Sequence, residues 1–130
     1  MTADDGVRLG RIGQVAMTVR DLPGAVRFYR DALGLPFLFE APPALAFFDC
    51  GGVRLMLSAP DGGGEAGKNS VLYFAVPDIR AAYDGLRGRG VVFVDEPHLI
   101  ARLPDREVWM CFLRDPDENL LGLMSEIPVG

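Results

Sequence analysis

The stretch "QVAMTVRDLPGAVRFYRDALGL", from Gln14 to Leu35, joins a short alternating segment to an amphipathic helix. Apolar residues occupy every second position of its first part, as expected of a β-strand with one buried face, namely Val15, Met17 and Val19. Asp21 is placed to cap a helix with Pro23 in its first turn, and Gly34 is placed to end it. The stretch therefore predicts a strand followed by a helix.

A fainter copy of this pattern, "VLYFAVPDIRAAYDGLRGRGV", runs from Val71 to Val91, with Asp78 in the capping position. Further short strands are predicted after the first helix at 36–39, 44–49 and 53–58, and after the second at 91–94, 107–113 and 120–125. Both halves thus predict the order β-α-β-β-β. The expected organisation is one domain with module one at about 11–60, a Gly-rich linker at 61–69, and module two at about 70–126.

Composition limits the classes of function. In a chain of 130 residues neither half alone buries a sufficient core, so the halves are expected to fold together. A formal charge of −5 without a Lys/Arg cluster argues against nucleic acid and anionic membranes as partners. No apolar run approaches the roughly 20 residues of a membrane span, and "MTADDGVRLGR" is no signal peptide, so a cytoplasmic location is expected.

The two cysteines, Cys50 and Cys111, lie in apolar strand-like surroundings. There is no CxxC pair and only one histidine, so free buried thiols are expected rather than a disulfide or a zinc site.

The second face of the predicted sheets is also apolar, although the open face of such a sheet is usually polar. The residues concerned are Met56, Tyr73, Leu120 and Met124. Something must cover this face, and a sheet that curves over a small-molecule cavity does so.

Three motifs in order resemble those of the vicinal oxygen chelate superfamily: "V-x-D-L" entering "FYRDALGL", "V-P-D-I" near mid-chain, and "DPDENLLGL" near the end. This superfamily includes glyoxalase I, methylmalonyl-CoA epimerase, extradiol dioxygenases and the fosfomycin- and bleomycin-resistance proteins. The resemblance covers about residues 11–126. It implies an α+β fold in which two β-α-β-β-β modules pair into a cup-shaped mixed sheet with helices on the outer face, and a homodimer.

In the metal enzymes of this superfamily, ligands come from equivalent positions of the first and last strands of each module. The resemblance places Gln14, Met56, Val71 and Gly122 at those positions. A Gln carbonyl is a weak ligand, a thioether suits soft ions, and Val and Gly offer no donor. A metal-free member without a cofactor is therefore expected.

His98 is the sole histidine and lies in "DEPHLIARLPDREV" with several carboxylates. These groups leave a relocated metal site open as an alternative. The favoured interpretation is a loop histidine among solvated charges, and a contact with ligand at the rim of the pocket is more credible than a metal.

Several other residues are candidates for a ligand site. Gln14 either binds ligand or satisfies a backbone group, and Arg54 either meets a carboxylate or phosphate or extends to water. Tyr73 offers an aromatic wall and a hydroxyl. Trp109 is favoured as a stacking wall, although Val108, Met110 and Phe112 alternate with it and are equally apolar. The "DPDEN" run is interpreted as a tight turn, and "DGGG" at 61–64 is not a phosphate-binding loop.

The leading prediction is a protein that binds an apolar or aromatic organic molecule without metal, as drug-sequestering resistance proteins do. The alternative is a lyase, isomerase or dioxygenase with a relocated metal or with acid–base catalysis by His98, Glu96 or Tyr73. A third interpretation is a structural or partner-binding subunit with no open pocket.

Overall fold

The computed structural model describes residues 6–59 and 66–129. The first module contains β1 (Gln14–Thr18), α1 (Leu22–Arg27), the π-helical turn η1 (Phe28–Ala32), β2 (Phe37–Ala41), β3 (Leu45–Cys50) and β4 (Val53–Ser58). The second contains β5 (Leu72–Ala75), α2 (Ile79–Gly88), β6 (Val92–Phe93), β7 (His98–Arg102), β8 (Arg106–Arg114) and β9 (Leu120–Pro128).

Each module builds one mixed sheet. The strand order is β1-β4-β3-β2 in the first sheet and β5-β9-β8-β6 in the second, with β7 paired to the outside of β8. In both sheets the first strand runs parallel to the last, β1 beside β4 and β5 beside β9, and the remaining pairs are antiparallel. The predicted α+β fold with repeated modules is confirmed.

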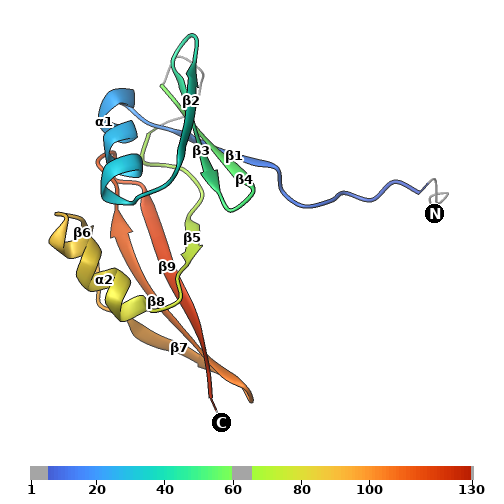
Figure 1. Ribbon diagram of the computed structural model, residues 1–130, viewed down its shortest axis with the longest axis vertical. Coiled ribbons are helices and arrows are strands. Elements are labelled where there is room, and N and C mark those ends of the chain that lie inside the picture. The colour runs from blue at the N-terminus through green and yellow to red at the C-terminus, as the bar shows by residue number, and fades with distance from the viewer. Residues whose placement is uncertain (1–5, 60–65, 130) are drawn as a thin grey trace.

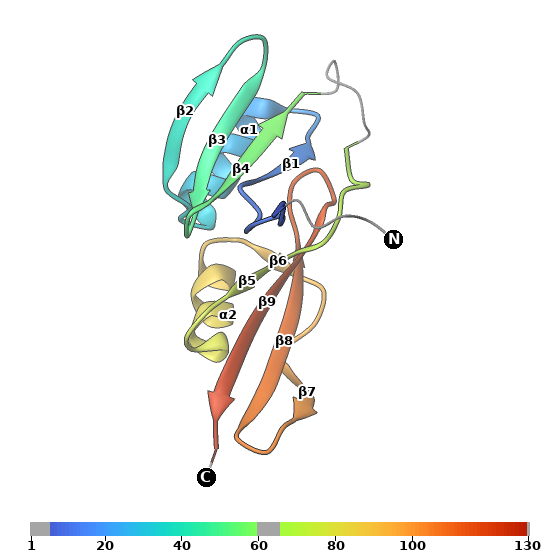
Figure 2. The ribbon, with the colours of Figure 1, turned by 90° about the vertical axis from the view of Figure 1, so that its right-hand side faces the viewer.

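The helices α1 and α2 lie on the same side of the molecule (Figure 1). Figure 2 looks onto the opposite side, where both sheets turn their helix-free faces to the viewer. An apolar residue on a helix-free face is therefore not covered by the helix of its own module.

The two helices begin differently despite similar sequences. The Asp78 carboxylate accepts a hydrogen bond of 3.1 Å from the backbone N–H of Ala81, whereas the side chain of Asp21 makes no capping bond. The first helix widens into a π-helical turn over its second half, and Gly34 follows at φ +78°. Glycine adopts this left-handed conformation without steric cost, so the predicted end is confirmed.

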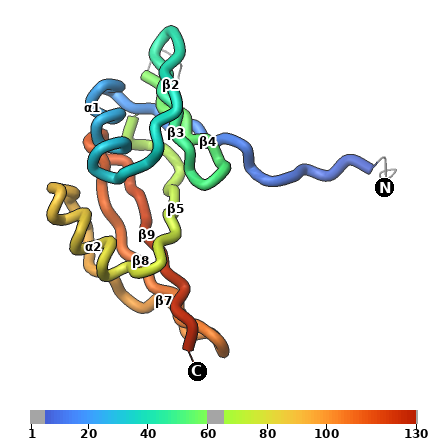
Figure 3. Tube along the Cα trace, viewed as in Figure 1, coloured from blue at the N-terminus to red at the C-terminus, as the bar shows by residue number. Residues whose placement is uncertain are grey.

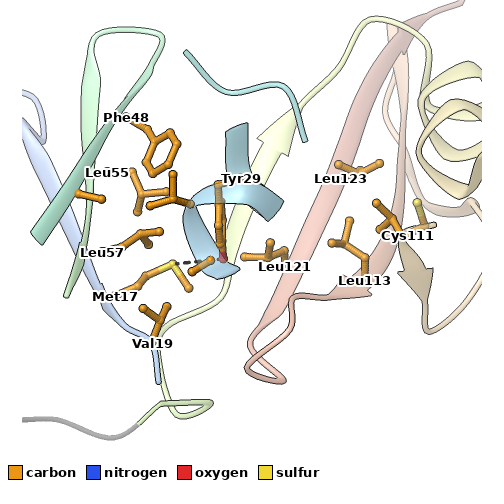
Figure 4. Packing of buried hydrophobic residues seen from close by; sticks show 14 of the residues in the cluster. Met17, Val19, Tyr29, Phe48, Leu55, Leu57, Cys111, Leu113, Leu121 and Leu123 are labelled. Atoms are coloured by element: carbon orange, nitrogen blue, oxygen red, sulfur yellow. Dashed lines mark hydrogen bonds between the residues drawn. The ribbon is translucent and has the colours of Figure 1, made fainter. Parts of the chain in front are cut away.

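The buried apolar side chains form one cluster that contains residues of both modules (Figure 4). Module one contributes Met17, Tyr29, Phe48, Leu55 and Leu57, and module two contributes Tyr83, Cys111, Leu113, Leu121 and Leu123. The modules therefore share a core, as expected from the small size of each half.

The second module differs in detail from the prediction. A strand, β7, begins at His98 where a loop was expected, and β9 continues to Pro128, beyond the predicted end at Ser125. The chain trace in Figure 3 shows β7 beside β8, far from the first module. The predicted 61–69 linker falls mostly outside the described residues, as do the glycines of "DGGG", so this part stays a prediction.

Candidate functional site

Strand register decides which residues share the helix-free faces. Directly opposed residues of neighbouring strands point to the same side of a sheet. Gln14 lies opposite Arg54, Tyr73 opposite Gly122, and His98 opposite Met110. Their immediate chain neighbours, such as Leu55 and Leu121, are buried in the core with the helices. All of the predicted site residues except Trp109 therefore lie on the helix-free faces, namely Gln14, Arg54, Met56, Tyr73, His98 and Gly122.

Trp109 lies on the other face of β8, so its expected role as a stacking wall for a ligand stays a prediction. It alternates with Met110 and Phe112 along β8 and packs, like Cys111, against the shared core. Its indole N–H donates a hydrogen bond of 3.1 Å to Glu107. The aromatic residue that β8 presents on the helix-free face is Phe112, opposite Gly122.

A cavity of about 720 Å³ lies between the two modules. Such a volume falls within the range of sites for small molecules. Of the predicted site residues, Arg54 and Tyr73 line it, together with the polar pair Asp49 and Cys50. The rest of the wall is mainly apolar and includes Val15, Leu35, Val53, Leu72, Phe74 and Ala75.

Arg54 is held in place by neighbours on the same face. Its Nε donates a hydrogen bond of 2.8 Å to Oε1 of Gln14, and its guanidinium carbon lies 5.4 Å from the ring centroid of Phe47. The Gln14 amide nitrogen lies 3.9 Å from the sulfur of Met56. The three predicted residues of module one therefore form a single connected group around one positive charge.

On the second sheet, Tyr73 covers the backbone of Gly122. A Cβ atom at position 122 would lie 2.7 Å from the ring carbon Cδ2 of Tyr73, closer than such atoms approach. The Tyr73 ring also meets Phe112 edge-on, with centroids 5.7 Å apart. The absence of a side chain at position 122 makes room for an aromatic wall.

These contacts do not fit the metal that the superfamily's enzymes use. The Gln14 carbonyl oxygen accepts from a guanidinium, whose positive charge opposes a divalent cation there. Met56 supplies only a thioether, and the space beside Gly122 is filled by Tyr73. Within residues 6–59 and 66–129, no three His, Cys, Asp or Glu side chains are grouped to hold a metal ion.

The surroundings of His98 give no support to a relocated metal. Its Nδ1 lies 2.9 Å from the Glu96 carbonyl oxygen and 3.7 Å from a carboxylate oxygen of Asp95. The other oxygen of Asp95 accepts from the backbone N–H of Phe112 at 2.8 Å. His98 is not among the residues that line the cavity, so a contact of His98 with ligand stays a prediction.

Both thiols are free, as expected. Burial, and secondarily the charge of Asp49, raises the pKa of the Cys50 thiol. Burial, with a smaller effect of Asp95, raises the pKa of Cys111 to about 11. Both are therefore protonated at neutral pH, which argues against either as a nucleophile.

The "DPDEN" run forms the predicted turn and also joins the modules, which the sequence did not indicate. Asp115 is buried and accepts hydrogen bonds from the Tyr29 hydroxyl at 2.7 Å and from the Asn119 backbone N–H at 2.8 Å. Asp117 accepts from the backbone N–H of Arg20 at 3.0 Å. The turn therefore joins the two modules through hydrogen bonds of its carboxylates.

Comparisons with known proteins agree with this geometry. The profile of the Glyoxalase/Bleomycin resistance protein/Dioxygenase superfamily matches residues 11–123, and the chain belongs to this superfamily. The uncharacterized protein YraH of Bacillus subtilis (strain 168) is 32% identical over an alignment of 126 positions, and the match covers 85% of this chain and 94% of YraH.

Solved structures show the same fold. A virulence protein from Salmonella typhimurium superimposes with a TM-score of 0.75 at 20% identity, covering 93% of this chain and 100% of that one. Lactoylglutathione lyase from Agrobacterium tumefaciens has a TM-score of 0.70 at 22% identity, covering 91% of this chain and 95% of that one.

None of the helices in the described ranges has the length and apolar character needed to span a membrane.

Proposed function

We propose that this protein binds a small organic molecule with an apolar or aromatic body in the cavity between its modules, without the metal of the superfamily's enzymes. The observation that carries the proposal is the mainly apolar cavity of about 720 Å³, with Arg54 and Tyr73 on its wall. Burial of ligand surface supplies the affinity, at roughly 25 cal/mol per Å² before the cost of association. Sequestration of a drug-like compound in the cytoplasm, and hence antibiotic resistance, fits such a site.

The proposed assembly is a homodimer formed on the helix-free side. An extended arm, residues 6–13, leaves the body on that side (Figures 1 and 3). Leu9 of the arm is 97% exposed and Ile12 is 66% exposed. Phe39 and Tyr73 add nearly half-exposed aromatic side chains to the helix-free faces. We propose that a second copy of the chain covers both the arm and the helix-free faces, because exposed apolar surface favours association.

The binding proposal is tested by adding aromatic and antibiotic compounds to the ¹⁵N-labelled protein and following backbone amide shifts. Saturable shifts of the cavity residues are expected. Ala75→Trp places a bulky ring on the cavity wall and should abolish them, whereas Ala81→Trp on exposed α2 is the matched control and should not. Absence of any saturable shift across the panel would contradict the proposal.

A further inference from the structure

We infer that the ligand carries an anionic group, a carboxylate or a phosphate, and that Arg54 binds it at the place where the superfamily's enzymes use a metal ion. This inference rests on the proposed binding function and adds the chemical class of the ligand. It follows from the contacts of the Arg54 side chain, from the loss of the metal donors around it, and from its place on the cavity wall.

The guanidinium of Arg54 is oriented before any ligand arrives. Its Nε–H is used by Gln14, and its plane is supported by the Phe47 ring at 5.4 Å, a cation–π contact. A guanidinium has two edges that can bind an oxyanion through parallel hydrogen bonds, one including Nε and one formed by the two terminal nitrogens. Since Gln14 takes Nε, the terminal edge is the one available to a ligand.

The charge balance of the site favours an anion. The metal donors expected at positions 14, 56 and 122 are replaced by an amide, a thioether and a glycine, none of which carries a negative charge. Arg54 adds a positive charge that no pH near neutrality removes. Where the metal enzymes of the superfamily use a divalent cation, this chain has the positively charged side chain of Arg54, whose N–H groups can bind the oxygens of a ligand directly.

Asp49 is the acidic residue on the same wall and lies opposite Arg54 across β3 and β4. Its Oδ1 accepts a hydrogen bond of 2.9 Å from the backbone N–H of Gly52. Although both residues are described, no ion pair within 4.0 Å joins them. Asp49 therefore does not occupy the guanidinium of Arg54 through a direct ion pair.

The test compares two probes of nearly equal shape, 2-naphthoate and 2-naphthamide, titrated into the full-length ¹⁵N-labelled protein in low salt. In the wild type, naphthoate is expected to bind at least about tenfold more tightly than the amide, a preference that weakens as salt rises. Arg54→Gln should reduce the preference to less than about twofold. Arg27→Gln, an exposed arginine of α1 that lies outside the cavity wall, changes the net charge equally and should preserve the preference.

The outcomes separate the inference from the function it rests on. If both probes bind the cavity with equal affinity, or if Arg54→Gln and Arg27→Gln reduce the preference equally, the assignment to Arg54 is wrong and the binding function stands. If neither probe shifts any cavity amide at millimolar concentration, aromatic binding itself is contradicted and the inference fails with it. Arg54→Lys keeps the positive charge but lacks the paired N–H donors of the guanidinium, so it should retain part of the preference for naphthoate.

Discussion

The phenolic hydroxyl of Tyr29 donates a hydrogen bond of 2.7 Å to Oδ2 of Asp115, a residue 86 positions along the chain in the other module. Both residues are buried, and burial, together with the neighbouring charge of Asp115, raises the pKa of Tyr29. Because a buried carboxylate without donors is costly, this contact makes the packing of one module depend on the other. The cavity also lies between the two modules, although neither Tyr29 nor Asp115 lines it.

Removing this hydroxyl should destabilise the whole fold. Tyr29→Phe leaves the ring in the core but removes one donor to Asp115, so the free energy of unfolding is expected to fall by about 1.5–3 kcal/mol. Urea denaturation followed by circular dichroism measures this change. Tyr73→Phe, which removes the hydroxyl of a ring that is 47% exposed, is the control and should alter stability by less than about 0.5 kcal/mol. Equal effects of the two substitutions would show that the contact contributes nothing.

The sequence predicted the parts of this arrangement that depend on local pattern. Alternation along the strands places Gln14, Arg54 and Met56 on one face, and the repeated order of strand, Asp and helix indicates two modules. It did not reveal the bond between Tyr29 and Asp115, because nothing local relates residues so far apart. The sequence of an acidic turn is the same whether its carboxylates face water or a buried hydroxyl.

The sequence also could not place Trp109 on either face of β8. Both faces of β8 are apolar, so a period of two identifies the strand but not the side on which the helices lie. The strand at His98 was missed because "HLIAR" does not alternate clearly and follows a proline. The strand forms by pairing with β8, and the local sequence does not indicate this pairing.

Stability should fall at alkaline pH through Cys111. Its folded pKa of about 11 lies above the ordinary thiol value of 9.0, so between pH 9 and 11 the thiol ionises mainly in the unfolded state. The stabilising contribution is therefore complete below pH 9 and is lost as pH rises toward 11, by at most about 1.4 kcal/mol per pH unit. Urea denaturation under reducing conditions, with Cys111→Ala as reference, should show the stability difference between the proteins shrinking across this window. A difference that does not vary with pH would contradict the assignment.

The two thiols should differ in reactivity. Cys50 is half-buried on the cavity wall, whereas Cys111 is fully buried. Iodoacetamide at pH 7.5 should label Cys50 slowly, because its pKa is raised, and should label Cys111 only in denaturant. Peptide mass spectrometry distinguishes the sites. A cavity ligand should slow the labelling of Cys50, and equal labelling of both thiols in the native protein would show that the core is more open than described.

The arm should control the oligomeric state. Replacing Leu9 and Ile12 with serine removes exposed apolar side chains without touching the core, and the double variant is expected to weaken the homodimer at least tenfold. Sedimentation velocity over a concentration series measures the dissociation constant. Leu103→Ser with Ile127→Ser, two exposed apolar residues located after β7 and near the end of β9 in the second module, is the control. A monomeric wild type, or equal weakening in the control, would exclude the arm as the dimer contact.

Gly122 should be intolerant of a side chain because of Tyr73. A methyl group at position 122 would lie 2.7 Å from Cδ2 and 3.0 Å from Cε2 of the tyrosine ring and 3.2 Å from Phe112, so the Tyr73 ring must move outward. Gly122→Ala is expected to cost about 1 kcal/mol or more of stability, although alanine otherwise favours a strand over glycine.

The coupling between the two positions separates this clash from a loss of backbone freedom. In the Tyr73→Ala background the added methyl group is left with the Phe112 ring at 3.2 Å as its close neighbour, so most of the cost of Gly122→Ala should disappear, giving an interaction free energy of about 1 kcal/mol in a double-mutant cycle. Additive effects would mean that the tyrosine ring does not restrict position 122. A glutamate at this position, where the resemblance places a metal ligand, would then have room, and the argument that this sheet cannot supply its part of a metal site would lose its steric basis.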